Sequence, residues 1–238
     1  MTIETLTSWS FSSLKEFERC PYSQFLKRIR KVERPAPKEG AANVRGQEIH
    51  NDAECFVDGR LPKLTKELKK FSEQFEALKE LYDNGQVALE SEWGFTLLWE
   101  PCGYNDYENV WLRVKGDAII MHDESTFTII DYKTGKSFGN EVPHNQQGQL
   151  YAVALMCMFP KAEAINVEFW YTDEGKTTRR NYTRKKLAPV MARFNQRAEK
   201  MTQTTEFQPK PNVINCRWCD YGPANGNGKC QYGVSNEL

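Results

Sequence analysis

Residues 114–134 read VKGDAIIMHDESTFTIIDYKT and decide the fold expected for this chain. Two short apolar segments lie on either side of the polar turn 123–125. Alternating β-branched residues around a tight polar turn predict an antiparallel hairpin. On such a hairpin Asp117 lies near Asp131, and Lys133 faces the same side as Asp131 because side chains alternate along a strand.

Two carboxylates and an ammonium on one sheet edge suit a specific chemistry. The carboxylates of Asp117 and Asp131 can hold a hard divalent cation such as Mg²⁺ or Mn²⁺. Lys133 can steady an attacking water or a phosphate oxygen, so the group predicts hydrolysis of phosphodiesters. An Asp-x-Lys on an edge strand is more often a solvated face without chemistry. The catalytic interpretation is favoured because the charges follow directly on the apolar run 127–130.

Composition sets the outer bounds. The chain has 238 residues, 32 basic and 32 acidic side chains and no net charge. This length predicts one domain with an appendage. The polar start, residues 1–10, and the lack of a long apolar run predict an intracellular, cytoplasmic protein without a membrane span, of bacterial, archaeal or viral origin.

A nucleic-acid interface requires local basic patches, because the overall charge is zero. Two basic runs are candidates, although any single run is more often a solvated face. They comprise Lys27, Arg28, Arg30, Lys31, Arg34 and Lys38, and then Arg179, Arg180, Arg184, Lys185 and Lys186.

The seven cysteines fall into two classes. Cys55, Cys102 and Cys157 stand alone and are expected to be small buried hydrophobic residues. Cys216, Cys219 and Cys230 lie in a tail rich in Pro and Gly that has too few apolar residues to fold by burial, so a metal is expected to order it. Cys20 is the best candidate for the fourth ligand. A disulfide is the alternative, but it fits an intracellular protein poorly.

Periodicity predicts the remaining elements. Helices are expected at 13–20 (opened by a capping box at Ser13), 21–30, 40–57, 64–84, 146–159 and 184–202, and strands at 87–99, 110–122, 126–134 and 164–172, with one more strand after the turn 173–175.

Two helical positions converge on the hairpin. His50 follows Gly46 on the helix before the sheet, and Gln147 and Tyr151 share one face of the helix after it, at i and i+4. Each has a simpler explanation: a lone helical histidine is more often a surface or capping residue, and Gln-x3-Tyr is common by chance. Their order around a paired-carboxylate hairpin favours a shared site.

In this order the motifs resemble the RecB-type nucleases of the PD-(D/E)XK superfamily, and the iron–sulfur branch in particular, with its CRISPR-associated single-strand exonucleases and the AddB nuclease domain. The similarity covers nearly the whole chain. Its motifs are Ser13-Leu14, Phe17, Cys20-Pro21, Gly46/His50, Gly116-Asp117, Asp131/Lys133, Gln147/Tyr151 and Cys216/Cys219/Cys230.

The resemblance implies an α/β fold: a restriction-endonuclease-like core with a central mixed β-sheet flanked by helices. It implies one nuclease domain over 1–238, in which Cys20 and the 206–238 tail form a metal-stapled module. His50, Asp117 and Asp131 would bind Mg²⁺ or Mn²⁺, Lys133 would position the water, and Gln147 and Tyr151 would order the site or the DNA. A further carboxylate is expected from the preceding strand, Glu92 by preference and Glu90 as its rival.

The branch also implies a [4Fe–4S] cluster on Cys20, Cys216, Cys219 and Cys230. The chain departs from the family pattern in two ways. Most family members have Glu where this chain has Asp131, a shorter ligand of equal charge. The interval from Cys219 to Cys230 is also longer than is usual, which keeps zinc as an alternative occupant.

Two classes of function follow from the resemblance. The first is a metal-dependent DNA exonuclease acting on single strands or DNA ends. The second is a non-catalytic DNA-binding accessory protein of a recombination or DNA-capture complex. Retention of His50, Asp117, Asp131 and Lys133 together favours the enzyme. In either case DNA is the expected partner, with recombination, repair or CRISPR-type proteins as further partners.

Overall fold

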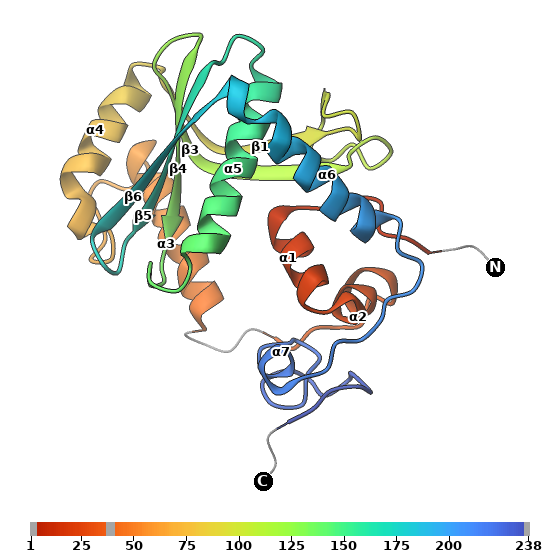
Figure 1. Cartoon of the computed structure of the whole chain (residues 1–238). Helices are drawn as coiled ribbons and strands as arrows, with labels where there is room; N and C mark the ends of the chain where they lie inside the picture. Colours follow the sequence, from red (N-terminus) through yellow and green to blue (C-terminus); the bar gives the residue numbers. More distant parts are fainter. Residues whose placement is uncertain (1–3, 37–40, 236–238) are drawn as a thin grey trace.

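A computed structural model describes residues 4–36 and 41–235. Its centre is a six-stranded sheet in the order β2-β1-β3-β4-β5-β6 (Figure 1). All neighbouring strands are antiparallel except β4 and β5, so the sheet is mixed. The strands are β1 (Val87–Phe95), β2 (Pro101–Cys102), β3 (Leu112–Met121), β4 (Thr126–Lys133), β5 (Ala164–Tyr171) and β6 (Lys176–Thr183).

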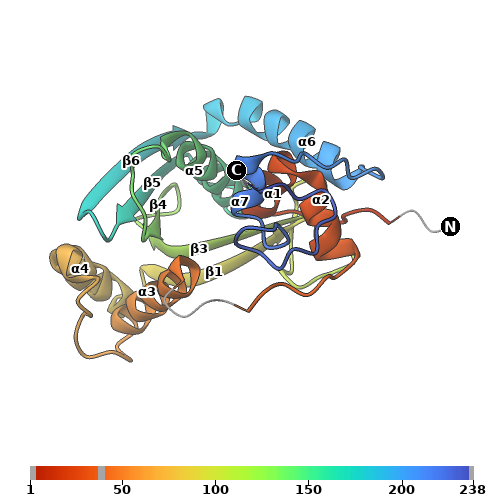
Figure 2. The same cartoon turned by 90° about the horizontal axis from the view of Figure 1, so that it is seen from below.

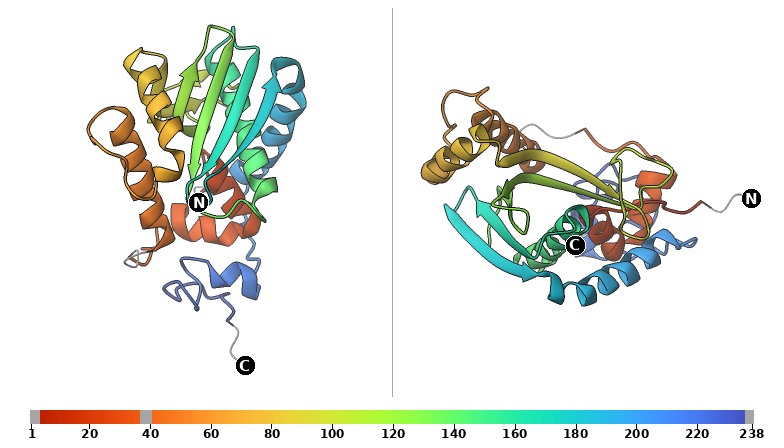
Figure 3. Two further views of the ribbon diagram at one scale, coloured as in Figure 1. Left: turned by 90° about the vertical axis from the view of Figure 1, so that its left-hand side faces the viewer. Right: turned by 90° about the horizontal axis from the view of Figure 1, so that it is seen from above.

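Helices cover both faces of this sheet. In Figures 2 and 3, α3 and α4 lie on one side of the strands and α5 and α6 on the other. The helices are α1 (Phe11–Arg19), α2 (Pro21–Gln24), α3 (Ala42–Val57), α4 (Ser72–Asp83), α5 (Glu141–Met158), α6 (Ala188–Thr202) and α7 (Val213–Arg217), with short helical turns η1 (Phe25–Ile29), η2 (Lys69–Phe71) and η3 (Arg184–Lys186). The expected α/β architecture, a mixed sheet flanked by helices, is confirmed.

Each face of the sheet has its own hydrophobic core. Under α3 and α4, Phe75 packs against Tyr132 and Trp170 of the sheet. Under α1, α5 and α6, Ile129 and Phe169 of the sheet belong to the larger core. The two helical layers are therefore held at fixed positions relative to the strands between them, because close-packed cores resist displacement.

The hairpin expected from residues 114–134 is confirmed. Strands β3 and β4 pair antiparallel from Ala118–Ile130 to Met121–Phe127. At the turn, the Asp123 carboxylate accepts hydrogen bonds from the backbone N–H groups of Ser125 and Thr126. Such local side-chain bonds favour a turn over a continued strand.

Several helix starts differ from the sequence prediction; α5, expected from 146, begins at Glu141. Helix α1 begins after Ser10: the Ser10 N–H donates to Ser13 Oγ (2.8 Å) and the Ser13 N–H donates to Ser10 Oγ, so Ser13 completes the cap from inside the helix. The amphipathic run expected from residue 64 is regular helix only from Ser72, because the chain before it, at η2, forms a tighter turn that still buries Phe71. The basic helix expected from 184 begins at Ala188, after η3.

The C-terminal segment lies against the N-terminal helices (Figure 1). Asn215 donates to the carbonyl of Arg19 (3.1 Å), and Lys210 donates to the carbonyl of Glu18 (2.9 Å). The Tyr221 hydroxyl donates to the carbonyl of Val32 (3.2 Å). The two ends of the chain are therefore in direct contact, as the pairing of Cys20 with the tail requires.

Three cysteines expected to be fully buried are only partly so. Cys55 lies in α3, Cys102 in β2 and Cys157 in α5, each with some exposure. Burial is still sufficient to raise the pKa of the Cys102 and Cys157 thiols. No helix in residues 4–36 and 41–235 has the length and apolar character needed to cross a bilayer.

Phe75→Ala tests the core beneath α3 and α4. The Phe75 side chain is fully buried, so its removal should lower the free energy of unfolding by about 3–5 kcal/mol. Denaturant titration followed by circular dichroism measures this change. Glu76→Ala, at an exposed position of the same helix, is the control and should change it by less than about 0.5 kcal/mol. Equal effects of both changes would contradict the packing described.

Candidate active site

Pairing of β3 with β4 brings two acidic side chains together. Ala118 pairs with Ile130, so the adjacent Asp117 and Asp131 lie near each other, and both are nearly inaccessible to solvent, at 7% and 3% exposure. Asp117 Oδ2 accepts the backbone N–H of Tyr132 (2.7 Å), which holds that carboxylate across the hairpin. A Cβ on the preceding Gly116 would lie 2.8 Å from the Ile129 side chain, so glycine lets the strands approach at this point.

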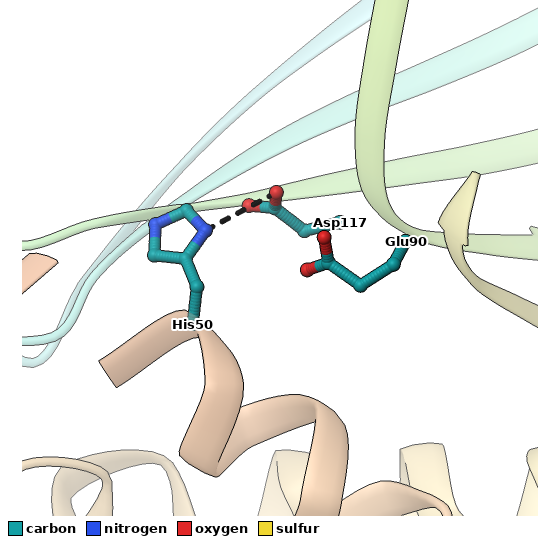
Figure 4. A group of neighbouring side chains, drawn as sticks. All are labelled: His50, Glu90 and Asp117. Atoms are coloured by element: carbon teal, nitrogen blue, oxygen red, sulfur yellow. Dashed lines mark ion pairs between the residues drawn. The ribbon is translucent and has the colours of Figure 1, made fainter. Parts of the chain in front are cut away.

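Helix α3 adds His50 to the pair. Its Nδ1 lies 3.2 Å from Asp117 Oδ1 (Figure 4). Burial lowers the pKa of His50, but the hydrogen bond to Asp117 and the charges of Asp117 and Asp131 outweigh burial and raise it above the usual value. Burial, followed by the charge of Asp131, raises the pKa of Asp117. The site therefore concentrates negative charge that a cation would neutralise.

Strand β1 contributes a third carboxylate, Glu90. One ligand atom each from His50, Glu90 and Asp117 lie within 4.8 Å of one another (Figure 4). Glu90 has a left-handed backbone, with φ of +44°, which is uncommon outside glycine. Glu92, the carboxylate preferred from the sequence, is exposed and lies 3.7 Å from Lys115, which also pairs with Glu90 at 2.8 Å. The structure thus brings the rival Glu90 into the group and leaves Glu92 outside it.

Asp131 is held from the other side by α5. Its Oδ1 accepts hydrogen bonds from the Tyr151 hydroxyl (2.5 Å) and from Gln147 Nε2 (3.1 Å). Gln147 Nε2 also lies 2.8 Å from the Tyr151 oxygen. The structure therefore brings Gln147 and Tyr151 onto the hairpin, as their i, i+4 spacing predicted.

Lys133 completes this group. Its ammonium contacts Asp131 Oδ2 and donates to Gln147 Oε1 (3.1 Å). The contact with Asp131 is an ion pair without hydrogen-bond geometry, so the buried Oδ2 accepts no hydrogen bond. A buried carboxylate oxygen lacking a hydrogen bond can still coordinate a metal ion. The ligand atoms that lie within 4.8 Å of one another come from His50, Glu90 and Asp117, a set of N and O donors that suits Mg²⁺ or Mn²⁺, and Asp131 is not part of this group.

A groove of about 440 Å³ opens beside Lys133. His144, which the sequence analysis did not single out, lines it and lies 2.7 Å from the Tyr171 oxygen through Nδ1. Burial, then the charge of Lys133, lowers the pKa of His144 to about 4. The sequence could have indicated His144, because it precedes Gln147 by three residues on α5 and both side chains therefore lie on one helix face. Lys15, Arg113 and Lys115 supply the positive charge of this groove.

The side chains within each basic run differ in their surroundings. In the second run, Arg184 donates to the carbonyls of Ala162 (2.8 Å), Met156 and Phe159 (both 3.1 Å), which is a structural role at the end of α5. In the first run, Arg28 is partly buried and Lys38 falls outside the described residues. Proximity in the sequence was therefore a poor guide to the charged surface.

Four cysteines from both ends of the chain line one small cavity: Cys20, Cys216, Cys219 and Cys230. The N–H of Lys210 lies 3.4 Å from Cys20 Sγ. Within residues 4–36 and 41–235, no three cysteine sulfurs lie within 4.8 Å of one another. The fold thus assembles the expected four residues around one space.

Comparisons with known proteins agree with this geometry. A family model described as the PD-(D/E)XK nuclease superfamily matches residues 8–224. The match spans most of the sequence, and the chain therefore belongs to this superfamily. A search of curated proteins found no match.

Three solved structures are similar in fold. SSO0001 is 15% identical, with a TM-score of 0.49, over 98% of this chain and 90% of that one. A proposed exonuclease from Eubacterium rectale is 10% identical, with a TM-score of 0.51, over 96% of this chain and 91% of that one. A phage-related exonuclease from Haemophilus somnus 129PT is 12% identical, with a TM-score of 0.33, over 84% and 94%. At these identities only the fold is compared, and only the second score exceeds 0.5.

The histidines provide a test of the site's electrostatics. In metal-free protein, His50 should stay protonated to above pH 6.5, whereas His144 should stay neutral down to about pH 4. NMR titration of the imidazole resonances, assigned with His50→Gln and His144→Gln, measures both. A His144 that titrates near pH 6.5 would contradict the described burial beside Lys133.

The two shifts act oppositely on stability. Protonated His50 stabilises the metal-free fold below its unfolded pKa, and this contribution is lost as pH rises through the raised pKa. Neutral His144 contributes stability that is lost as pH falls from about 6.5 towards 4. The melting temperature of wild type relative to His50→Gln should therefore fall as pH rises above about 6.5, whereas that of wild type relative to His144→Gln should fall as pH decreases from about 6.5 towards 4.

Proposed function

We propose that this member of the PD-(D/E)XK nuclease superfamily is a Mg²⁺- or Mn²⁺-dependent deoxyribonuclease that hydrolyses phosphodiester bonds of single-stranded DNA or DNA ends. The observation that carries the proposal is the buried pair Asp117 and Asp131, opposed on one hairpin with Lys133 against the second carboxylate. Two buried carboxylates this close to each other destabilise a fold by charge repulsion. We therefore infer that they serve a function rather than stability.

The metal would be held by His50, Glu90, Asp117 and Oδ2 of Asp131. When bound, a divalent cation polarises the phosphate and lowers the pKa of a bound water. The protein's own part is to position these donors. The His50–Asp117 contact orients the imidazole, and the N–H of Tyr132 fixes the Asp117 carboxylate. Glu90 is proposed as a ligand in place of Glu92 because its carboxylate lies within 4.8 Å of the ligand atoms of His50 and Asp117.

Lys133 is proposed to bind the attacking water or a phosphate oxygen at the groove. Its ammonium is oriented by Asp131 and Gln147, so little side-chain freedom remains to be lost when substrate arrives. Tyr151 donates to the same carboxylate and holds it in place, which makes Tyr151 and Gln147 positioning residues. Asp131 is one methylene shorter than Glu, and its two bonds from α5 keep it in reach of the site.

The exonuclease assignment rests on the sequence resemblance. It agrees with the description of the Eubacterium rectale protein of similar fold as an exonuclease. The groove beside Lys133 supports a nucleic-acid strand as substrate, because four basic side chains, Lys15, Arg113, Lys115 and Lys133, line it.

We further propose that Cys20, Cys216, Cys219 and Cys230 hold a structural [4Fe–4S] cluster. Support comes from their convergence on one cavity and from the family resemblance. Zinc, which also accepts four thiolates, is the alternative occupant.

Cleavage should require a divalent cation and both hairpin acids. Asp117→Asn and Asp131→Asn should reduce hydrolysis of labelled single-stranded DNA in Mn²⁺ below detection, because each removes a charged ligand. Lys133→Ala should lower kcat by roughly 10²–10³-fold with less effect on metal affinity. Full activity of folded Asp131→Asn would reject the catalytic site. DNA binding without cleavage under any metal would favour the non-catalytic accessory protein.

Glu90 and Glu92 provide a matched pair for this assay. Glu90→Gln should weaken the activation by Mn²⁺, whereas Glu92→Gln, two residues away and exposed, should leave it within about twofold of wild type. The reverse result would restore Glu92 as the ligand.

The cysteine module predicts a coloured protein. Anaerobically purified protein should be brown and contain about four iron and four acid-labile sulfide per chain. Cys216→Ala should bleach it and expose the Arg19 and Lys210 regions to proteolysis. Cys157→Ala, outside the cavity, is the control and should keep the colour. One tightly bound zinc in colourless protein would instead identify a zinc module, and a metal-free protein would refute the metal site.

A further inference from the structure

A second cavity continues the groove beside Lys133. It has a volume of about 280 Å³ and lies between the N-terminal segment, η1 and β3. Ser10, Ser12, Tyr104 and Arg113 line both spaces. A strand that enters the groove at Lys133 can therefore reach the second cavity without leaving the surface.

Uncompensated positive charge gathers in this cavity. Arg28 donates to the carbonyl of Ser8 (2.6 Å) and to its hydroxyl (3.0 Å), and Arg113 donates to the same hydroxyl (2.6 Å). In the parts of the chain that the structure describes, neither guanidinium has a carboxylate within 4.0 Å. Lys27 is the third cation of the lining and pairs with Glu16 at 2.9 Å. Three cations thus face one anion.

This arrangement is costly without a ligand. Burial, followed by the charge of Arg113, lowers the pKa of Arg28, and Glu16 offsets only part of this effect. Partly buried charges that lack a counter-ion destabilise a fold unless an anion is bound. The cavity therefore carries an excess of positive charge that a bound anion would neutralise.

Aromatic rings mark the wall shared with the groove. Arg113 lies over the rings of Tyr104 and Tyr107, with its guanidinium carbon 5.8 and 5.3 Å from their centroids. Tyr104 lines both spaces, and Tyr107 is 78% exposed beside the same guanidinium. Basic side chains interleaved with exposed aromatic rings suit a single strand, whose phosphates pair with the cations and whose bases stack on the rings.

We propose that the cavity around Arg28 and Arg113 binds a phosphate group of the DNA strand, separate from the phosphate that is cleaved beside Asp117 and Asp131. The inference rests on the proposed function for the identity of the strand. The phosphate is either an internal linkage or the terminal phosphate of the strand, and the same side chains recognise both. Arg28 would then set the register of the strand on the active site.

A purely structural explanation is available and predicts a different result. Arg28 and Arg113 both hold Ser8, so they could serve only to anchor the N-terminal segment. In that case Arg28→Gln would lower the melting temperature and leave the contribution of every phosphate to DNA binding unchanged. A binding measurement that identifies one phosphate separates the two explanations.

The test is a cycle that pairs a protein variant with a neutralised phosphate. Binding of a labelled single strand of about twelve nucleotides is measured by fluorescence polarisation in EDTA, so that nothing is cut. Each internal phosphate is replaced in turn by a neutral methylphosphonate, and each terminal phosphate by a hydroxyl. Wild type, Arg28→Gln and Arg30→Gln are compared. Arg30 lies two residues away, is exposed and does not line the cavity, which makes it the matched control.

Neutralising one particular phosphate of the strand should weaken its binding to wild type and to Arg30→Gln by roughly tenfold or more. The same change should weaken its binding to Arg28→Gln by less than about twofold. Arg28→Gln should also reduce the slope of log affinity against log salt by about 0.7. Coupling at an internal position identifies an internal phosphate, and coupling at an end identifies a terminal one; either supports the proposal. Absence of coupling at every position would overturn it.

Two further measurements keep the result interpretable. If Arg28→Gln does not fold by circular dichroism, Lys27→Gln, which removes another cation of the same cavity, replaces it in the cycle. Cleavage in Mn²⁺ is recorded separately for wild type. Cleavage without coupling rejects this inference alone, whereas coupling without cleavage rejects the proposed nuclease and retains the phosphate site.

Discussion

The opposition of two buried carboxylates across one hairpin is the constraint on which the rest of this structure depends. Pairing of β3 with β4 places Asp117 against Asp131, and their mutual repulsion must be offset within the site. The neighbouring donors serve this purpose: His50 bonds the first carboxylate, while Lys133 and Tyr151 contact the second. The arrangement is stable only while these partners remain in place, and a bound cation would relieve the same repulsion.

The two hydrophobic cores keep those partners in place. The core under α4 supports α3, so His50 approaches the hairpin from a packed helix. The opposite core is built largely from α5, which carries Gln147 and Tyr151 towards Asp131. Because packed helices move little relative to a sheet, the donors are oriented before any ligand arrives. The packed helices thus fix the positions of the donors, and the hairpin provides the two carboxylates that they contact.

Outside the core, charge and cysteine chemistry extend the site along one side of the molecule. The groove beside Lys133 runs into the cavity of Arg28 and Arg113, which is bounded by the start of α1. The end of the same helix leads to Cys20 and the cysteine cavity. Because α1 contacts both, ordering of the C-terminal segment would also support the wall along which a nucleic-acid strand is proposed to lie. A structural cysteine module, as proposed, would thereby also stabilise the proposed path of the strand.

Sequence alone determined the elements whose signals are local. The hairpin with Asp117, Asp131 and Lys133 followed from strand alternation around a polar turn, and Gln147 with Tyr151 followed from helical spacing; the structure contains both. It did not determine the start of α1, because Ser10 and Ser13 share the cap reciprocally and either could open the helix. Only the tertiary structure brought Glu90 rather than Glu92 beside His50, through a left-handed residue that strand periodicity does not anticipate. It alone paired Arg28 with Arg113, which lie far apart in the sequence, because that contact depends on how α1, η1 and β3 pack rather than on any local pattern.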